Sequence, residues 1–281
     1  MSLKLGSTTI HQIHLATSST KIVPDGVFDI PSRSGTYDVK SYAFARASFE
    51  DNLEKRVGNN LLYYSNSSMS RIGMFAFAGT SISSINAPAV TSIGQSAFLH
   101  CQQLTSVTFP SCAYIGGAAF RECDNLIAIN FPQCSSINYA AFQSCSKLTT
   151  VSLPTTISYA LYSSVFQNCV ALTSVNFAKC NYIGELCFSN CVSLTGSVSF
   201  STTLSFIGSS AFYNTRITSL YGPGILRIHY TAFSNCVSLA NINLPICTSI
   251  DGYAFYSCDS LTSITLPACT SINGGYAFGH C

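Results

Sequence analysis

The chain carries very little charge. Only 9% of its 281 residues are Asp, Glu, Lys or Arg, and the formal net charge is +2. An average soluble protein has about a quarter of its residues charged. A near-neutral surface lacks the basic field that attracts nucleic acid or anionic lipid. We therefore expect neither as a partner.

Long apolar runs are also absent. The mean hydropathy is positive, at +0.33, yet no unbroken apolar stretch reaches the roughly 18 residues that a membrane-spanning helix needs. The first residues contain no continuous apolar segment with a cleavage site, so no secretory signal peptide is visible. We expect no membrane insertion and a surface made of Ser, Thr, Asn and Tyr.

Motifs of catalysis and metal binding are missing as well. The chain has no C-x-x-C pair, phosphate-binding loop or metalloprotease motif. His100 and Cys101 could form a base and a nucleophile, but adjacent residues on a strand or turn point apart, and no third orienting group recurs near them. We predict that the protein is not an enzyme and uses no cofactor or metal.

What the chain does contain is a repeat, in which Ala-Phe or a close variant recurs every 21 to 24 residues. An Ile precedes each Phe, and most repeats place a Leu six residues after it. The repeated residues are Phe77, Phe98, Phe120, Phe142, Phe166, Phe188, Phe212, Phe233, Phe255 and Phe278.

Each repeat predicts two short extended segments. The pattern L-x-x-V-x-F-P, as in 104–110, alternates apolar and polar residues at the period of a strand and ends in a proline, which cannot donate to a sheet. The pattern I-G-x-x-A-F predicts a second extended piece and a turn. In that turn we expect positive φ at Gly94, Gly116, Gly184 and Gly208.

One such unit cannot bury its apolar residues alone, but stacked units cover one another. We therefore predict a mainly β fold of the α/β-solenoid class, a parallel β-solenoid of about ten repeats of 21–24 residues with a short N-terminal β or capping segment.

The combined motif L-x-x-V-x-L-P, then I-G-x-x-A-F-x-x-C-x-x-L, resembles the Treponema-type leucine-rich repeats of the BspA-like family. The match runs from about residue 68 to 281 and rests on Pro, Ile-Gly, Ala-Phe and Cys at fixed offsets. The resemblance implies a leucine-rich-repeat solenoid and an adhesin-like bacterial protein, at the cell surface or secreted. Its partner would be a host matrix protein, a cell-surface protein or a glycan. The alternative is a structural spacer, such as a prophage-associated rod that presents an attached group.

Some repeats depart from the motif. Thr215 replaces the Cys, and Val165 and Cys187 replace the Ala. The segment YGPGIL, 221–226, replaces the usual strand end, so we expect a bent or loosened turn there.

Three regions are expected along the chain. Residues 1–36 predict a small β segment, 37–76 a degenerate repeat with a cap, and 77–281 the repeat array. The charged segment 49–64 is the candidate cap. An uncovered apolar repeat at the other end would favour end-to-end self-association.

Thirteen of the 14 cysteines form two columns, and Cys187 stands alone. Three interpretations compete: zinc ligands, disulfides between neighbouring repeats, or small buried residues that fill the wall of the coil. Ligands in line do not converge on a tetrahedral ion, and parallel side chains approach poorly for a disulfide. We predict a largely unoxidised wall. Eight cysteines follow the repeated Phe by three residues: Cys101, Cys123, Cys145, Cys169, Cys191, Cys236, Cys258 and Cys281. Five lie eleven residues further on: Cys112, Cys134, Cys180, Cys247 and Cys269.

The outward positions of the main strand carry uncharged polar residues, and repeat arrays commonly bind ligands along such a sheet. Short polar side chains also cover a sheet without any ligand, so this pattern alone does not prove a site. An edge lined by Tyr is a second candidate. The predicted ligand-binding residues are Ser106, Thr108, Asn130, Thr150, Ser152, Ser174, Asn176, Asn241 and Asn243.

Overall fold

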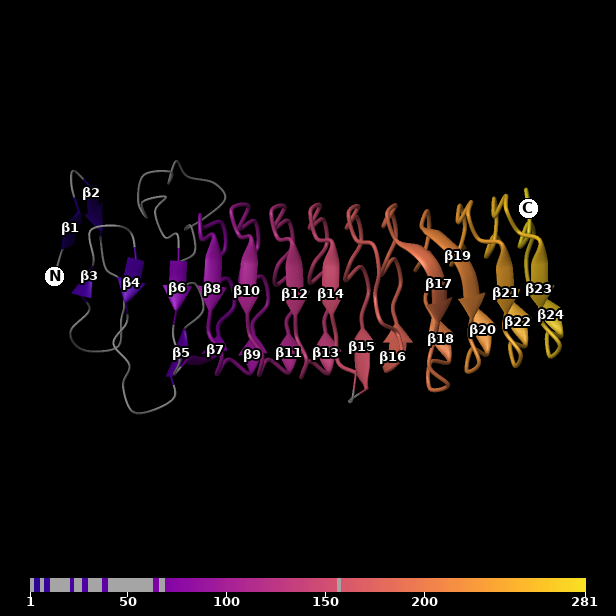
Figure 1. Cartoon of the computed structure of the whole chain (residues 1–281), viewed down its shortest axis with the longest axis horizontal. Coiled ribbons are helices and arrows are strands. Elements are labelled where there is room, and N and C mark those ends of the chain that lie inside the picture. Colours follow the sequence, from indigo (N-terminus) through magenta and orange to yellow (C-terminus); the bar gives the residue numbers. More distant parts are fainter. Residues whose placement is uncertain are drawn as a thin grey trace.

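The computed structural model describes residues 69–155 and 158–281 completely, together with the backbone of the short strands before residue 66. The described chain is an all-β parallel solenoid of about nine turns with roughly 22 residues each, and it contains no helix (Figure 1). The predicted β-solenoid is therefore confirmed.

Each turn contributes two short strands that pair in parallel with those of the next turn. One strand of each turn enters an eleven-stranded sheet that runs along the whole array. Its strands are β5 (Tyr37–Val39), β7 (Met69–Ile72), β9 (Ser92–Ile93), β11 (Tyr114–Ile115), β13 (Ser136–Ile137), β15 (Tyr159–Leu161), β16 (Cys180–Ile183), β18 (Phe206–Ile207), β20 (Arg227–Ile228), β22 (Ser249–Ile250) and β24 (Ser271–Ile272).

The other strand of each turn belongs to one of two sheets. The seven-stranded sheet holds β3 (Lys21–Ile22), β4 (Val27–Asp29), β6 (Tyr63–Ser65), β8 (Ser84–Asn86), β10 (Ser106–Thr108), β12 (Ala128–Asn130) and β14 (Thr150–Ser152). The four-stranded sheet holds β17 (Thr195–Ser199), β19 (Arg216–Tyr221), β21 (Asn241–Asn243) and β23 (Ser263–Thr265).

Near the N-terminus, β1 (Leu3–Leu5) pairs antiparallel with β2 (Thr8–Ile10). β4 pairs in parallel with β6, and β6 and β7 pair in parallel with β8 and β9, so sheet pairing crosses the boundaries predicted after residues 36 and 76. The three-region division stays a prediction. Of the candidate cap at 49–64, only 63–64 lies among the described residues.

The solenoid encloses a column of stacked phenylalanine rings. The repeated Phe residues have no exposed surface from Phe77 to Phe255, and their neighbouring ring centroids lie 4.9 to 5.5 Å apart with nearly parallel planes. A main-chain bond accompanies each step: the Phe98 N–H donates to the Ala119 carbonyl at 2.7 Å. Because each ring contacts the rings before and after it, the aromatic repeat forms the core.

The glycines that follow the repeated Ile are required for a reason other than the predicted one. The expectation of positive φ at Gly94, Gly116, Gly184 and Gly208 is wrong, because none of them has it. A Cβ on Gly116 would lie 2.6 Å from the backbone carbonyl carbon of Gly94, in the preceding turn. Glycine is needed at these positions because successive turns of backbone approach closely.

Positive φ falls instead on both sides of the repeated Phe. Around Phe98, Ser96 has φ of 53° and His100 has φ of 58°. The same two positions recur in the following turns, and after the Phe they are often Asn, the non-glycine residue that best tolerates this conformation. The tight turn around the Phe is thus made mostly by residues other than glycine, among them Leu186 as well as Ser and Asn.

Both cysteine columns are free thiols in the wall of the coil, as predicted. In the first column each thiol donates to the carbonyl of the repeated Phe in the turn before it. For example, Cys123 Sγ lies 3.1 Å from the Phe98 oxygen. In the second column the thiol donates to the carbonyl two residues ahead, as Cys112 does to Tyr114 at 3.3 Å. The cysteine is a buried donor that satisfies carbonyls at the corners of the coil.

We predict that these thiols resist alkylation until the chain unfolds. Burial raises the pKa of Cys101, Cys112 and Cys134 to about 12, so almost none of them is ionised at pH 8, and the thiolate is the reactive form. Iodoacetamide at pH 8 without reductant should label the native protein only at Cys269 and Cys281, the two cysteines of the 14 that are not buried. Mass spectrometry after urea should find all 14 labelled. Fewer labels in urea would reveal disulfides and contradict the free-thiol wall.

The main-strand side of the solenoid is interrupted between β14 and β17. There the turn forms only an isolated bridge, from Thr150 to Ser174. The turn predicted to be loosened is instead well paired as far as Tyr221: β19 is six residues long and keeps register with β21, and 222–226 follow it outside the strands. The extra length of β19 is accommodated by a bulge in its pairing with β17. The register between the two strands shifts between Gly196 and Ser197, and Gly196 has φ of +84°.

Candidate functional site

The outer faces of the seven-stranded and four-stranded sheets form the candidate site. Along β10, β12, β14 and β21 the central residue is buried while both flanking residues are exposed. The parallel register places these exposed residues in two columns along the solenoid axis. We call these two columns, continued through β8, β17, β19 and β23 by the same register, the polar strip.

None of the described positions in these two columns is charged, and the exposed Arg216 lies outside them, at the start of β19. Hydroxyl and amide groups dominate, with one Ala and one Tyr among them. The members of the strip are Ser84, Asn86, Ser106, Thr108, Ala128, Asn130, Thr150, Ser152, Ser197, Ser199, Ser219, Tyr221, Asn241, Asn243, Ser263 and Thr265.

The threonines that flank the strip already donate their hydroxyl hydrogens to carbonyl groups of the preceding turn. Thr105 Oγ1 donates to the Ser83 carbonyl at 3.0 Å, and Thr149 Oγ1 donates to the Ile127 carbonyl at 3.1 Å. Thr173 and Thr262 repeat this bond to the preceding turn. These flanking threonines act as braces between turns.

Most predicted strip residues have no such partner. Within the described chain, no side-chain hydrogen bond to another residue is made by Ser106, Thr108, Asn130, Thr150, Ser152, Asn241 or Asn243. Their donors and acceptors face solvent from a fixed backbone. This contrast with the braced threonines singles the strip out as a surface that can hydrogen-bond a ligand.

The structure corrects the expected continuity of the strip. Ser174 lies at the isolated bridge rather than in a strand, and Asn176 Oδ1 accepts a hydrogen bond from the Ala178 N–H at 2.9 Å. Sequence reasoning also missed Ser219 and Tyr221, because the departure at 221–226 concealed the strand. The alternation in RITSLY, 216–221, was the signal that could have found them.

The aromatic side chains on the outside of the eleven-stranded sheet, which include the predicted Tyr edge, mostly contact one another between turns. Tyr162, Tyr182 and Phe206 follow one another on the outside of the eleven-stranded sheet, and Phe206 then contacts the His229 ring at a centroid distance of 4.4 Å. The Tyr182 and Phe206 rings are parallel within 3°, so their faces cover each other instead of facing solvent. A ligand role for the Tyr edge stays a prediction.

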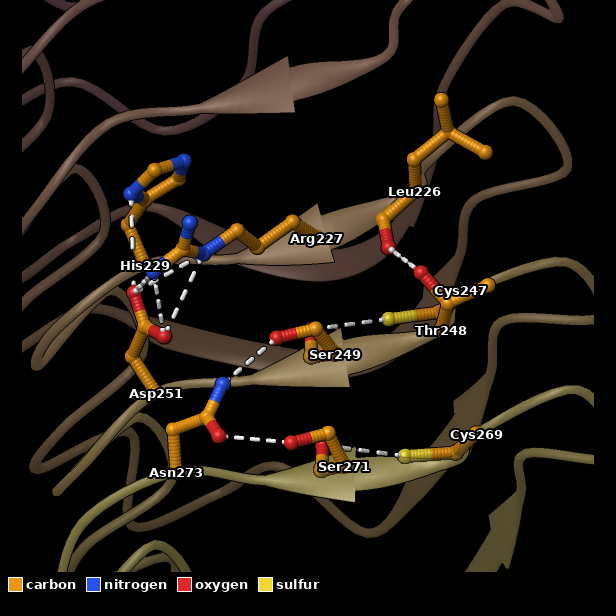
Figure 2. A network of polar contacts seen from close by, with 10 residues as sticks. All are labelled: Leu226, Arg227, His229, Cys247, Thr248, Ser249, Asp251, Cys269, Ser271 and Asn273. Carbon is orange, nitrogen blue, oxygen red and sulfur yellow. Dashed lines mark hydrogen bonds and ion pairs between the residues drawn. The ribbon is translucent and has the colours of Figure 1, made fainter.

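A network of polar contacts links three turns at β20, β22 and β24 (Figure 2). Arg227 donates to both Asp251 oxygens, with its Nη2 2.8 Å from Oδ1, and His229 Nδ1 lies 3.6 Å from Oδ2. Asn273 Nδ2 donates to Ser249 Oγ at 3.0 Å. Partial burial, with help from the Arg227 charge, lowers the pKa of His229. Since Asp251 is fully engaged by Arg227, we interpret the network as a brace between turns.

The structure separates His100 from Cys101. The His100 ring reaches Glu122, with Nδ1 2.7 Å from Oε2, whereas the buried Cys101 thiol donates to the Phe77 carbonyl at 3.0 Å. The two side chains point apart, as predicted. Among the described residues no group of three His, Cys, Asp or Glu could hold a metal ion. No helix in this part of the chain is long and apolar enough to span a membrane.

The repeat spacing, the free cysteine columns and the phenylalanine stack converge on one family. A model described as the BspA type leucine rich repeat region matches residues 70–195 and 159–281, in six copies. The chain belongs to the BspA-type leucine-rich repeat family. The resemblance seen in the sequence is thereby confirmed.

Two solved structures of similar proteins agree with this fold. A leucine-rich cell surface protein of Faecalibacterium prausnitzii is 19% identical with a TM-score of 0.50, covering 100% of this chain and 98% of that one. A leucine-rich repeat protein of Bacteroides ovatus is 19% identical with a TM-score of 0.55, covering 95% and 92%. The leucine-rich repeat protein of T. pallidum is 22% identical, covering 71% and 76% with a TM-score of 0.37. No curated protein matches the chain.

Proposed function

We propose that this BspA-type protein is a non-enzymatic binding module of the bacterial surface, adhesin-like, that holds a host matrix protein, a cell-surface protein or a glycan on its polar strip. The observation that carries the proposal is that some hydroxyl groups on this face bond to the protein itself while their neighbours have no partner within it. Thr105 and Thr149 are consumed by bonds between turns, while Ser106, Thr108 and Thr150 are exposed and unpaired among the described residues. Repeat arrays commonly bind ligands along such an extended face.

Two further observations support a surface role. The F. prausnitzii structure is that of a cell surface protein, and the family likeness makes the same location our proposal here. The stack of rings and the braces between turns make the array a stiff support, on which exposed polar groups keep fixed positions. Such preorganisation reduces the entropy cost of binding.

The test is a paired substitution on opposite faces of the solenoid. We expect Ser106→Glu with Thr150→Glu to abolish saturable binding to immobilised matrix proteins or glycans, since it places charged side chains where uncharged groups meet the ligand. The control is Ser92→Glu with Ser136→Glu, also two turns apart but on the eleven-stranded sheet. Equal loss in both variants would contradict the strip as the site. An unmodified protein that binds nothing in a surface-binding assay would favour the structural spacer.

A further inference from the structure

We infer that the ligand of the polar strip is a neutral, linear, repeating glycan that lies along the solenoid axis, and that each chain has two separate sites for it. This inference rests on the proposed function and deepens it. It starts from the chemistry of the strip and from the interruption at Ser174.

The residue types of the strip do not suit a protein partner. Protein interfaces depend on a few large anchors, mainly Trp, Tyr and Arg, and Ser and Thr are under-represented among the residues that carry binding energy. Tyr221 is the only aromatic residue among the strip positions described, and none is Arg. The strip instead offers short groups that both donate and accept hydrogen bonds. A ligand covered in hydroxyl groups is the complement of such a surface.

The spacing of the strip favours a repeating polymer. Register pairing puts Ser84 beside Ser106, and Asn130 beside Ser152, at the separation of adjacent strands, about 4.8 Å. An extended sugar chain advances by a comparable length per ring, so each turn can meet one sugar with its two outward side chains. The absence of charge on the strip favours a neutral sugar over an acidic one.

The break at Ser174 divides the strip into two segments. β8, β10, β12 and β14 belong to the first segment, which continues in parallel pairing into β6 and β4, and β17, β19, β21 and β23 belong to the second. Between the two segments Asn176 uses its side-chain oxygen on its own backbone. A single glycan chain therefore cannot follow matching turns across the break, and each segment makes a separate site.

Calorimetric titration with β-1,4-linked glucose and mannose oligomers, from the disaccharide to the octasaccharide, tests this inference. We expect affinity to rise about two- to tenfold for each added sugar over the first four sugars, as one net hydrogen bond would give, because each segment has at least four strands in register. Two oligomers should bind per chain, and affinity should be insensitive to salt because no charged pair is involved.

Variants separate the two segments. Ser106→Glu with Thr150→Glu should remove one of the two sites, and Ser197→Glu with Asn241→Glu should remove the other. The Ser92→Glu and Ser136→Glu control should keep both. A single site per chain overturns the division into two segments, and affinity that does not rise with oligomer length overturns the repeating-polymer ligand.

The same titrations distinguish this inference from the proposed function. If none of these oligomers binds, but an immobilised matrix protein does and loses binding in the first variant, the glycan inference fails while the proposed function stands. If neither ligand type responds, both fail.

Discussion

Replacing Phe142 with alanine is expected to destabilise the array by about 3–5 kcal/mol, the usual cost of truncating a fully buried aromatic side chain. Phe142 has no exposed surface. Its ring is stacked between Phe120, at a centroid distance of 5.1 Å, and Phe166, at 5.5 Å. Alanine would leave a cavity in the middle of the column and remove both ring contacts, each of which is worth about 0.5–1.5 kcal/mol beyond its buried area.

Urea unfolding followed by circular dichroism measures this loss, and hydrogen exchange locates it. Because each turn contacts only its neighbours, exchange should accelerate most in the turns on either side of residue 142. Tyr114→Ala is the control, since that side chain is 46% exposed and should cost less than about 0.5 kcal/mol. A Phe142→Ala loss below about 1 kcal/mol would show that the stack is not the main stabilising element.

The sequence predicts the interior of this fold well because the interior repeats. Residues such as Phe98, Cys123 and Leu126 recur at offsets that the coil dictates, and each is fully buried where the pattern places it. The alternation around Val107 likewise predicts which side chains face out, and β10 has that pattern. A repeated environment imposes the same choice of residue again and again, so the pattern can be read without a structure.

Departures from the repeat are harder to read. The interruption at Ser174 follows a turn with inserted residues around Tyr159, where the register between β15 and β16 shifts. Nothing in the letters S-V-N-F, 174–177, distinguishes this segment from strands that do pair. The outcome depends on how neighbouring turns absorb an insertion, which is a property of the stack rather than of any single repeat.

The glycines illustrate a second limit. The repeated Ile-Gly pair in this sequence predicts positive φ at the glycine. Gly94 and Gly116 are needed instead because the backbone of the previous turn lies against them and leaves no room for a side chain. Both needs select glycine, and one sequence cannot distinguish them. The distinction matters because the two needs predict different responses to substitution: positive φ penalises almost any side chain, whereas close approach penalises volume.

Gly116→Val is therefore expected to cost about 1–3 kcal/mol through overpacking. A Cβ at this position would lie 2.6 Å from both the Gly94 carbonyl carbon and the Gln95 nitrogen, so two turns of backbone must move apart. Asn138 holds the equivalent position one turn later, where its side-chain amide reaches the Ile115 carbonyl at 3.4 Å.

Gly116→Asn should accordingly be milder than Gly116→Val, since it can repeat the bond that Asn138 makes to the preceding turn. Gly275→Val is the control, because no atom lies within 4 Å of a Cβ built there and its φ is not positive. Urea unfolding of the three variants ranks them. Equal losses for Asn and Val at 116 would mean that the contact of the shared Cβ with the preceding turn sets the whole cost, and a smaller loss for Asn would mean that its bond to the preceding turn offsets part of that contact. A loss for Gly275→Val as large as that for Gly116→Val would contradict close approach of the turns as the reason for glycine at 116.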